Sequence, residues 1–252
     1  MAPAYADELA IARRAAEEAG RFALGHFKTS LTVEYKGDGS PVTIADRGAE
    51  EMLRRTLGAA FPADGFLGEE LGETSGTSGR RWIIDPIDGT QSFVRGVPLW
   101  GVLIALEEHG RCVLGVVALP ALGETLWAAR GGGAFVNGAP ARVSTATTLT
   151  DATLLTSDAS PRHFGAKHAG FQRLLGQSAR HRGWGDCYGY ALVATGRAEV
   201  MLDPLMNPWD AAAVMPIIEE AGGTFCAWDG TPTIYGGSAL AMPAALRAPT
   251  GR

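Results

Sequence analysis

A short acidic segment, from Asp85 to Thr90, has the residue types and spacing best suited to chemistry in this chain. It follows the apolar run from Trp82 to Ile84, which predicts a strand, so Asp85 and Asp88 stand at the carboxyl end of that strand. Two carboxylates this close repel each other unless a cation holds them, and hard divalent cations with oxygen ligands are the usual solution. Gly89 and Thr90 offer backbone N–H groups that would cradle an anion if a helical turn begins there.

The same segment also fits an ordinary turn, because Asp, Pro and Gly dominate turns for reasons unrelated to catalysis. Further acids at predicted element boundaries favour a site: Asp46, Glu69, Glu70 and Asp210. Each of these acids also has a purely structural explanation. The glutamates suit a solvated loop, Asp46 suits a capping box with Thr43, and Asp210 suits the positive end of its helix. Together the acids match the ligand placement of a multi-metal hydrolase, but spacing alone does not establish that they converge.

The elements that must position these acids in the first half are helices followed by a meander. Residues 7–27 carry apolar side chains at alternating steps of three and four, which predicts an amphipathic helix. A second helix follows Thr43 as its N-cap and places Asp46 in its first turn. Short apolar strands are predicted at 82–84, 100–106, 112–119 and 125–129, with turns between them. We expect residues 81–143 to form an antiparallel sheet.

The second half alternates between strands and helices. Strands are predicted near 153–157 and 199–202, and helices near 167–176, 187–195 and 209–221. The last helix has Asn207 as N-cap, Pro208 at its first position and Gly222-Gly223 as its stop, so Asp210 lies in its first turn. This alternation indicates a layered α/β arrangement. We expect two subdomains, residues 1–145 and 146–252, that share an interface, which is where clefts tend to form.

Composition excludes several classes of partner. The formal charge is −5 with no block of like charge, which argues against a nucleic-acid or polybasic membrane surface and favours a small-molecule partner. Cys112, Cys187 and Cys226 lie far apart without CxxC spacing, which predicts buried thiols of a reducing compartment. No segment resembles a signal peptide, and no apolar run approaches the ~20 residues of a membrane span. We therefore expect a cytoplasmic protein.

Three motifs resemble those of the inositol monophosphatase family, the lithium-sensitive, metal-dependent phosphatases. They are Gly68-Glu69-Glu70, the run from Trp82 to Thr90, and Trp209-Asp210-Ala211-Ala212-Ala213. The upstream run from Pro41 to Asp46 also fits, and the order and spacing match over nearly the whole chain. The combination is far more specific than any single motif.

The resemblance implies an α+β fold, a layered α-β-α-β-α sandwich with a meander sheet in the first half and a smaller mixed sheet in the second, usually as a homodimer. It implies two or three Mg²⁺ ions per active site. The implied chemistry is hydrolysis of a phosphate monoester by direct attack of metal-activated water, without a phosphoenzyme. The implied roles are metal ligation by Glu69, Asp85, Asp88, Asp210 and the carbonyl of Ile87; catalysis by Asp46, Glu69 and Thr90; and substrate binding by Asp88, Gly89, Thr90 and Asp210.

Substrate preference depends on residues that line the alcohol pocket, and two stretches resemble the histidinol-phosphate phosphatase branch of the family: Gln91 to Pro98, and Arg182 to Tyr190. Histidinol carries an ammonium and an imidazole, and Asp186 with an aromatic neighbour is able to bind both. The alternatives are that Asp186 is an N-cap for the helix at 187 and that Trp184 and Tyr188 are core residues.

The first functional hypothesis is therefore a histidinol-phosphate phosphatase of histidine biosynthesis. The second is an inositol monophosphatase or broader sugar-phosphate phosphatase of the same family, which shares the mechanism and differs in the pocket. A third, from another class, is a relative that binds metal and ligand as a regulatory module without turnover. The intact acidic motifs argue against the third.

Overall fold

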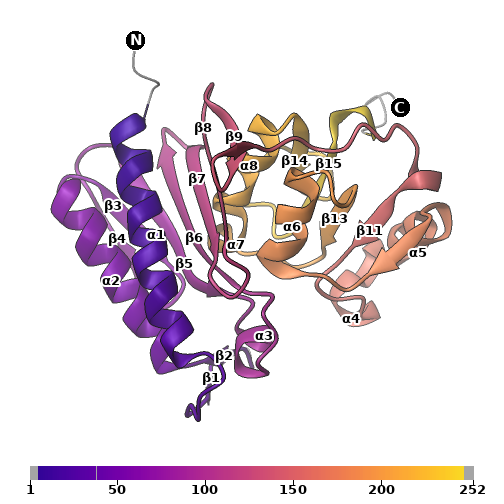
Figure 1. Cartoon of the computed structure of the whole chain (residues 1–252). Helices are drawn as coiled ribbons and strands as arrows, with labels where there is room; N and C mark the ends of the chain where they lie inside the picture. Colours follow the sequence, from indigo (N-terminus) through magenta and orange to yellow (C-terminus); the bar gives the residue numbers. More distant parts are fainter. Residues whose placement is uncertain (1–4, 38, 247–252) are drawn as a thin grey trace.

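The computed structural model describes residues 5–37 and 39–246, and within them one large sheet is the scaffold of the first half (Figure 1). The remaining residues of the two predicted subdomains, 1–4, 38 and 247–252, lie outside the described part. Eight described strands lie in the order β10-β9-β8-β7-β6-β5-β3-β4. Their bounds are β3 Gly65–Gly68, β4 Gly72–Thr74, β5 Arg80–Asp88, β6 Gly101–Glu108, β7 Arg111–Leu119, β8 Glu124–Ala129, β9 Gly133–Val136 and β10 Ala139–Pro140.

From β5 to β10 the sheet is the predicted antiparallel meander. It extends further than expected, because β3 pairs parallel to β5 and antiparallel to β4. The strand β5 is also longer than the predicted strand at 82–84, because it continues through the acidic segment to Asp88.

Two long helices, α1 (Ala6–His26) and α2 (Ile44–Ala60), cover one face of this sheet. On α1, Ala12, Ala16 and Ala19 are fully buried at the predicted helical spacing, so their small side chains let the two helices pack closely on the strands. The short strands β1 (Glu34–Tyr35) and β2 (Pro41–Val42) pair just before α2 begins. The five-residue helix α3 (Thr90–Val94) follows β5 directly.

A middle layer of helices separates the large sheet from the second sheet (Figure 1). It consists of α6 (Asp186–Ala194), α7 (Pro208–Ala212) and α8 (Val214–Glu220). The core that surrounds it joins Ile83 and Leu126 of the large sheet to Phe225 of the second. Gly115 in β7 permits a close approach of the middle layer, since a Cβ at this position would lie 2.1 Å from the carbonyl oxygen of Ala213.

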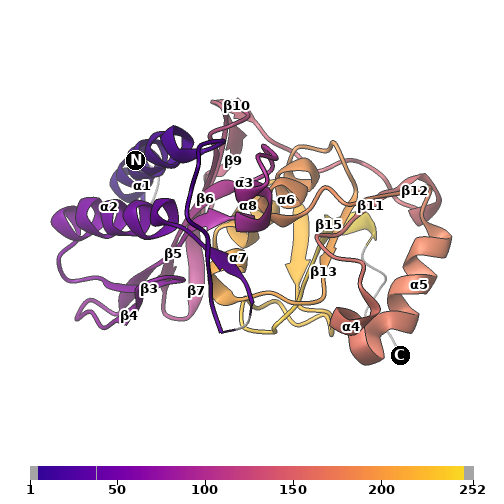
Figure 2. The same cartoon turned by 90° about the horizontal axis from the view of Figure 1, so that it is seen from below.

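The second sheet is mixed and has the described strand order β12-β11-β13-β15-β14. Its bounds are β11 Thr153–Leu155, β12 Arg180–Arg182, β13 Val200–Asp203, β14 Gly223–Cys226 and β15 Ala239–Pro243. β11 runs parallel to β12 and β13, and β15 runs antiparallel to β13 and β14. Helices α4 (Pro161–Phe164) and α5 (His168–Gln177) cover its outer side (Figure 2), where Phe164 and Phe171 pack on Leu154 and Leu202.

These layers form the expected α-β-α-β-α sandwich, and the smaller mixed sheet of the second half is confirmed. The prediction of one continuous helix over 209–221 is wrong, because α7 ends at Ala212 and α8 begins at Val214. Pro216 has no N–H to donate to the carbonyl of Ala212, which accounts for a break at this point. All three cysteines are buried, as expected.

Candidate active site

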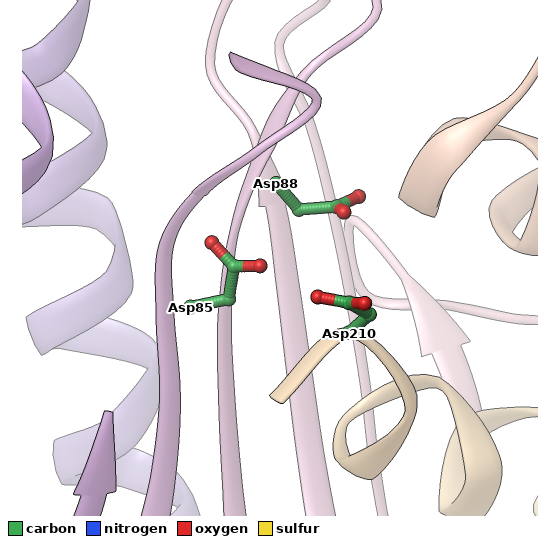
Figure 3. Close-up of side chains that lie close together, drawn as sticks. All are labelled: Asp85, Asp88 and Asp210. Atoms are coloured by element: carbon green, nitrogen blue, oxygen red, sulfur yellow. The ribbon is translucent and has the colours of Figure 1, made fainter. Parts of the chain in front are cut away.

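Three aspartates from two distant parts of the chain face one another between the large sheet and the middle helices (Figure 3). Carboxylate oxygens of Asp85, Asp88 and Asp210 all lie within 4.8 Å of one another. Asp85 and Asp88 belong to the end of β5, and Asp210 belongs to the first turn of α7. The convergence that spacing alone left open is therefore present in the fold.

A bulge at the end of β5 turns Asp85 and Asp88 to the same side. Residues three apart on a regular strand face opposite sides of a sheet. Between these aspartates the pairing with β6 shifts, so that three steps along β5 match two steps along β6. Pro86 has no N–H for the ladder and suits such a break, and the Ile87 N–H donates to Asp85 Oδ1 at 3.0 Å. The Asp-Pro-Ile-Asp order thus places both carboxylates in one site.

Asp210 is held by the start of its own helix. Asn207 occupies the N-cap position and Pro208 follows in the first turn, as predicted. The Asn207 N–H donates to Asp210 Oδ2 at 2.7 Å. The capping explanation and the site explanation for this residue are therefore compatible.

Glu69 reaches the cluster from the turn between β3 and β4. Besides burial, its negative charge raises the pKa of Asp85 and of Asp210 by repulsion, so its carboxylate lies near both. Lys36 Nζ lies 2.7 Å from Glu69 Oε1 and 2.6 Å from Glu70 Oε1, so the two glutamates are paired with one ammonium and do not form a freely solvated loop. Lys36 was missed at the sequence level, since nothing near it in the chain distinguishes it from a surface lysine.

Asp46 is fully buried in the first turn of α2 and makes two kinds of contact. Its Oδ2 accepts the Thr43 N–H at 2.8 Å, which completes the predicted capping box. Its Oδ1 lies 3.3 Å from the Thr90 hydroxyl, which also lies 2.9 Å from the carbonyl oxygen of Ile87. A hydroxyl has one proton to donate, so Thr90 bonds either Asp46 or Ile87 at a given moment.

Gly89 and Asp186 lie next to each other, beside the aspartate cluster. Gly89 is the N-cap of α3 with φ of 82°, and a Cβ there would lie 2.9 Å from the Leu99 carbonyl and 3.1 Å from Asp186 Oδ2. Asp186 is not an N-cap, since Gly185 has that position in α6. Its φ of 53° is in the left-handed region, and its N–H donates to Ser157 Oγ at 2.7 Å.

The two aromatic neighbours of Asp186 differ: one is exposed and free to contact a substrate, and the other packs against the core. Trp184 is 42% exposed and is not a core residue, whereas Tyr188 is partly buried and packs against the main core. The N–H of Cys187 donates to Asp88 Oδ2, so the start of α6 is tied directly to the aspartate cluster.

Sequence reasoning missed Asp203, which lies at the end of β13 and is 4% exposed. It accepts the Ser157 N–H at 3.0 Å and the Tyr190 hydroxyl at 3.0 Å. These three residues line a cavity of about 80 Å³ together with Asp88, Asp186 and Asp210. The strand-end argument that singled out Asp85 applies equally to Asp203 and would have found it.

The gathered acids are costly to ionise together. Burial raises the pKa of Asp85 and of Asp88 well above the usual range, and the neighbouring carboxylates raise both further. Burial also raises the pKa of Asp186 to about 7 and of Asp210 to about 6, again with added repulsion from nearby acids. A divalent cation among these oxygens would relieve both effects, so the donor set fits a hard metal ion.

The sequence model of the inositol monophosphatase family matches residues 5–250. The chain belongs to this family. It is 48% identical over 234 residues to a histidinol-phosphatase of Chlorobaculum parvum, which covers 92% of this chain and 90% of that protein. It is 38% identical over 226 residues to an inositol-1-monophosphatase of Mesorhizobium japonicum, which covers 86% of this chain and 84% of that protein.

A solved structure supports the same placement. The extragenic suppressor protein suhB from Bartonella henselae matches with a TM-score of 0.90 and 32% identity over 96% of each chain. The present chain, as a member of the inositol monophosphatase family, is a phosphoric monoester hydrolase. The family is metal dependent, in agreement with the carboxylate cluster of the site. Among the described residues, no helix has the length and apolar character needed to cross a bilayer.

Proposed function

We propose that this phosphatase hydrolyses histidinol phosphate to histidinol in a Mg²⁺-dependent reaction of histidine biosynthesis. The observation that carries the substrate assignment is the position of Asp186, whose carboxylate lies against Gly89 and lines the cavity next to the aspartate cluster. An ammonium group on the alcohol part of the substrate would find its counter-charge there. The 48% identity to a histidinol-phosphatase supports the same substrate.

The cluster supplies the proposed ligands for two or three Mg²⁺ ions: Glu69, Asp85, Asp88, Asp210 and the carbonyl oxygen of Ile87. Magnesium bound at these oxygens would supply Lewis acidity, which activates water and neutralises charge on the phosphate and the leaving alkoxide. Without this cation, burial removes the carboxylates from water and neighbouring acids repel them, and both effects raise their pKa values.

Asp46 and Thr90 form the proposed water-activating pair, with Glu69 as the third catalytic residue. Released from the Ile87 carbonyl, the Thr90 hydroxyl would donate to Asp46 Oδ1 and accept a hydrogen bond from the attacking water. As the water attacks, Thr90 would pass its proton to the Asp46 carboxylate and take the water's proton in its place. Asp46 keeps its orientation during this exchange because its other oxygen remains bound to the Thr43 N–H. The N–H groups of Gly89 and Thr90, at the start of α3, are proposed to hold the phosphate.

The alcohol side is proposed to recognise charge. Asp186 lies in surroundings that raise its pKa to about 7, and a substrate ammonium would stabilise its ionised form. Trp184 lies two residues earlier in the chain and is exposed, and we propose that its ring packs on the imidazole. Asp88 and Asp210 complete the proposed substrate contacts from the cluster side.

The second candidate is an inositol or sugar phosphatase. One observation favours it: Ser157, Tyr190 and Asp203 bring hydroxyl and carboxylate groups to the same cavity, and such groups suit a polyol. The 38% identity to an inositol-1-monophosphatase is consistent with it.

The setting of the reaction is part of the proposal. We place the enzyme in the cytoplasm, because buried thiols suit a reducing compartment. We expect a homodimer in which each chain comprises the subdomains 1–145 and 146–252, with the site between them.

Phosphate release from a substrate panel tests the proposal. The panel contains histidinol phosphate, inositol monophosphate, fructose bisphosphate and a 3′-phosphonucleotide, each assayed with Mg²⁺ and with a chelator. We expect the highest kcat/KM for histidinol phosphate and loss of all turnover on chelation. Preference for inositol monophosphate would favour the second candidate, and turnover that survives chelation would refute metal dependence.

A further inference from the structure

A fully buried glutamate outside the proposed ligand set lies beneath the turn that carries Glu69. Glu50 lies on α2, one helical turn after Asp46, and both acids are 0% exposed. Glu50 does not belong to the Asp85, Asp88 and Asp210 cluster. A carboxylate buried this completely has to be satisfied by donors, so its partners reveal what it does.

The donors to Glu50 come from the turn that follows Glu69. The Glu70 N–H donates to Glu50 Oε2 at 2.8 Å, and the Leu71 N–H lies 3.3 Å from Oε1. Arg54, one turn further along α2, donates from Nε to Oε1 at 2.8 Å. These three hydrogen bonds to the Glu50 carboxylate are of the charge-assisted kind, which is the stronger class.

Arg54 continues the same clamp to the next strand. Its guanidinium donates to the Gly72 carbonyl and lies 3.2 Å from Thr74 Oγ1. On the other side, the Glu69 N–H donates to the Ile84 carbonyl at 3.2 Å, one residue before Asp85. The turn is thus fixed to α2 through Glu50 and Arg54 and to β5 through its own backbone.

Gly68 shows how tightly this arrangement is built. A Cβ at residue 68 would lie 1.9 Å from Glu50 Oε1, so the carboxylate occupies the space that any side chain would need. The glycine of the Gly68-Glu69-Glu70 motif is therefore required by the buried glutamate. Without that glutamate the Glu70 and Leu71 amides would lose their acceptor, and beyond residue 69 the turn would lead into β4, a three-residue exposed edge strand.

We propose that Glu50 is a positioning residue that fixes the Glu69 carboxylate in the geometry needed to hold Mg²⁺. The proposal rests on the proposed role of Glu69 as a metal ligand. Groups that orient metal ligands without touching the metal commonly contribute 10- to 100-fold in affinity. Glu50 acts through the backbone amides of the turn. Its loss should therefore weaken Mg²⁺ affinity and have little effect on kcat once Mg²⁺ is saturating.

The test is calorimetric titration of the substrate-free protein with Mg²⁺, with melting temperatures measured in parallel. We expect E50Q to weaken Mg²⁺ binding about 10- to 100-fold, because the amide keeps the volume but replaces one acceptor by a donor. G68A provides a second, charge-neutral route to the same effect, since its Cβ displaces the Glu50 carboxylate. At saturating Mg²⁺, kcat of either variant should recover toward the wild-type value.

D64N is the matched control. Asp64 is also a buried carboxylate held by an arginine, but it lies just before β3, at the end remote from Glu69, where it binds Arg80 and Trp82. D64N should lower the melting temperature and leave the Mg²⁺ titration unchanged. If D64N weakens Mg²⁺ binding as much as E50Q does, the effect is general destabilisation and the proposal fails.

E69Q separates this proposal from the function on which it rests. If E69Q weakens Mg²⁺ binding while folded E50Q and G68A bind like the wild type, the positioning role is wrong and the ligand assignment stands. If E69Q itself binds Mg²⁺ like the wild type, Glu69 is not a ligand and both ideas fall.

Discussion

The two sides of the active site are built by different means. On the side of the large sheet, two of the acids are held by close neighbours in the chain: Asp85 by an N–H two residues away, and Asp46 by one three residues away. On the side of the second sheet, Asp203 and Asp186 are held through Ser157, which is 46 and 29 residues away, respectively. The geometry of these two metal-side acids is therefore locally encoded, whereas the proposed alcohol side depends on packing between distant segments.

Under the proposed function, this difference separates the residues of the chemical step from the residues that select the substrate. The geometry of a bulge or a capping box depends on contacts between residues close in the chain, so it does not depend on how distant segments pack. The alcohol side instead responds to any shift of β11, α6 or β13 relative to one another. The two sides meet where the Cys187 N–H donates to Asp88.

The largest effect is expected for D88N, which removes charge from the metal side and keeps an acceptor for the Cys187 N–H. We expect kcat to fall about 1,000-fold, because a metal ion contributes several kcal/mol and each 1.4 kcal/mol is a factor of ten. Steady-state phosphate release checks this, with circular dichroism to verify folding. An unchanged rate would show that the cluster is not the catalytic centre.

A smaller and selective effect is expected for D186N on the alcohol side. Loss of one charge-assisted contact should lower kcat/KM for histidinol phosphate about 10- to 100-fold. The change for inositol monophosphate should be much smaller, since inositol carries no ammonium. D229N, which changes an exposed acid elsewhere, is the control. Equal losses on both substrates would show that Asp186 supports the site without reading the substrate.

The smallest effect is a shift of stability with pH in Mg²⁺-free protein. Burial raises the folded-state pKa of Asp186 to about 7 and of Asp203 and Asp210 to about 6. The folded state therefore binds more protons than the unfolded one, and the stability from these groups is lost as pH rises through about 6 to 7.

We expect the melting temperature to fall between about pH 5 and pH 8 with a chelator present, and to fall less with saturating Mg²⁺, because the cation favours the ionised carboxylates. Scanning calorimetry over this range, with and without Mg²⁺, is the measurement. Parallel curves in the two conditions would contradict the account.

The same local-versus-distant contrast decides what the sequence could predict. The helix with Ala12 and Ala16 on its buried face, the β6–β7 hairpin and the family were all recognisable, because periodicity and motif order are local signals. The parallel β3–β5 pair was missed, since four residues with a glycine at each end carry little strand signal. The break at Ala213 was missed because Pro216 lies in an otherwise helical apolar run.

The candidate site divides in the same way. The sequence suggested that Asp85, Asp88 and Asp210 belong together, and the fold brings them within reach of one another. It gave no indication of Lys36 or Ser157, whose importance depends on contacts with residues far along the chain. Their places follow from the packing of layers, which single-residue patterns do not record.

The capping box of α2 has one more consequence. Asp46 belongs both to the N-terminal capping box of α2 and to the proposed water-activating pair. The proposed general base is therefore part of the first turn of α2. Fraying of that turn, the least protected part of any helix, would switch off turnover long before the protein unfolds. Thermal inactivation should then precede melting, and hydrogen exchange at the amides that follow Thr43 would report it.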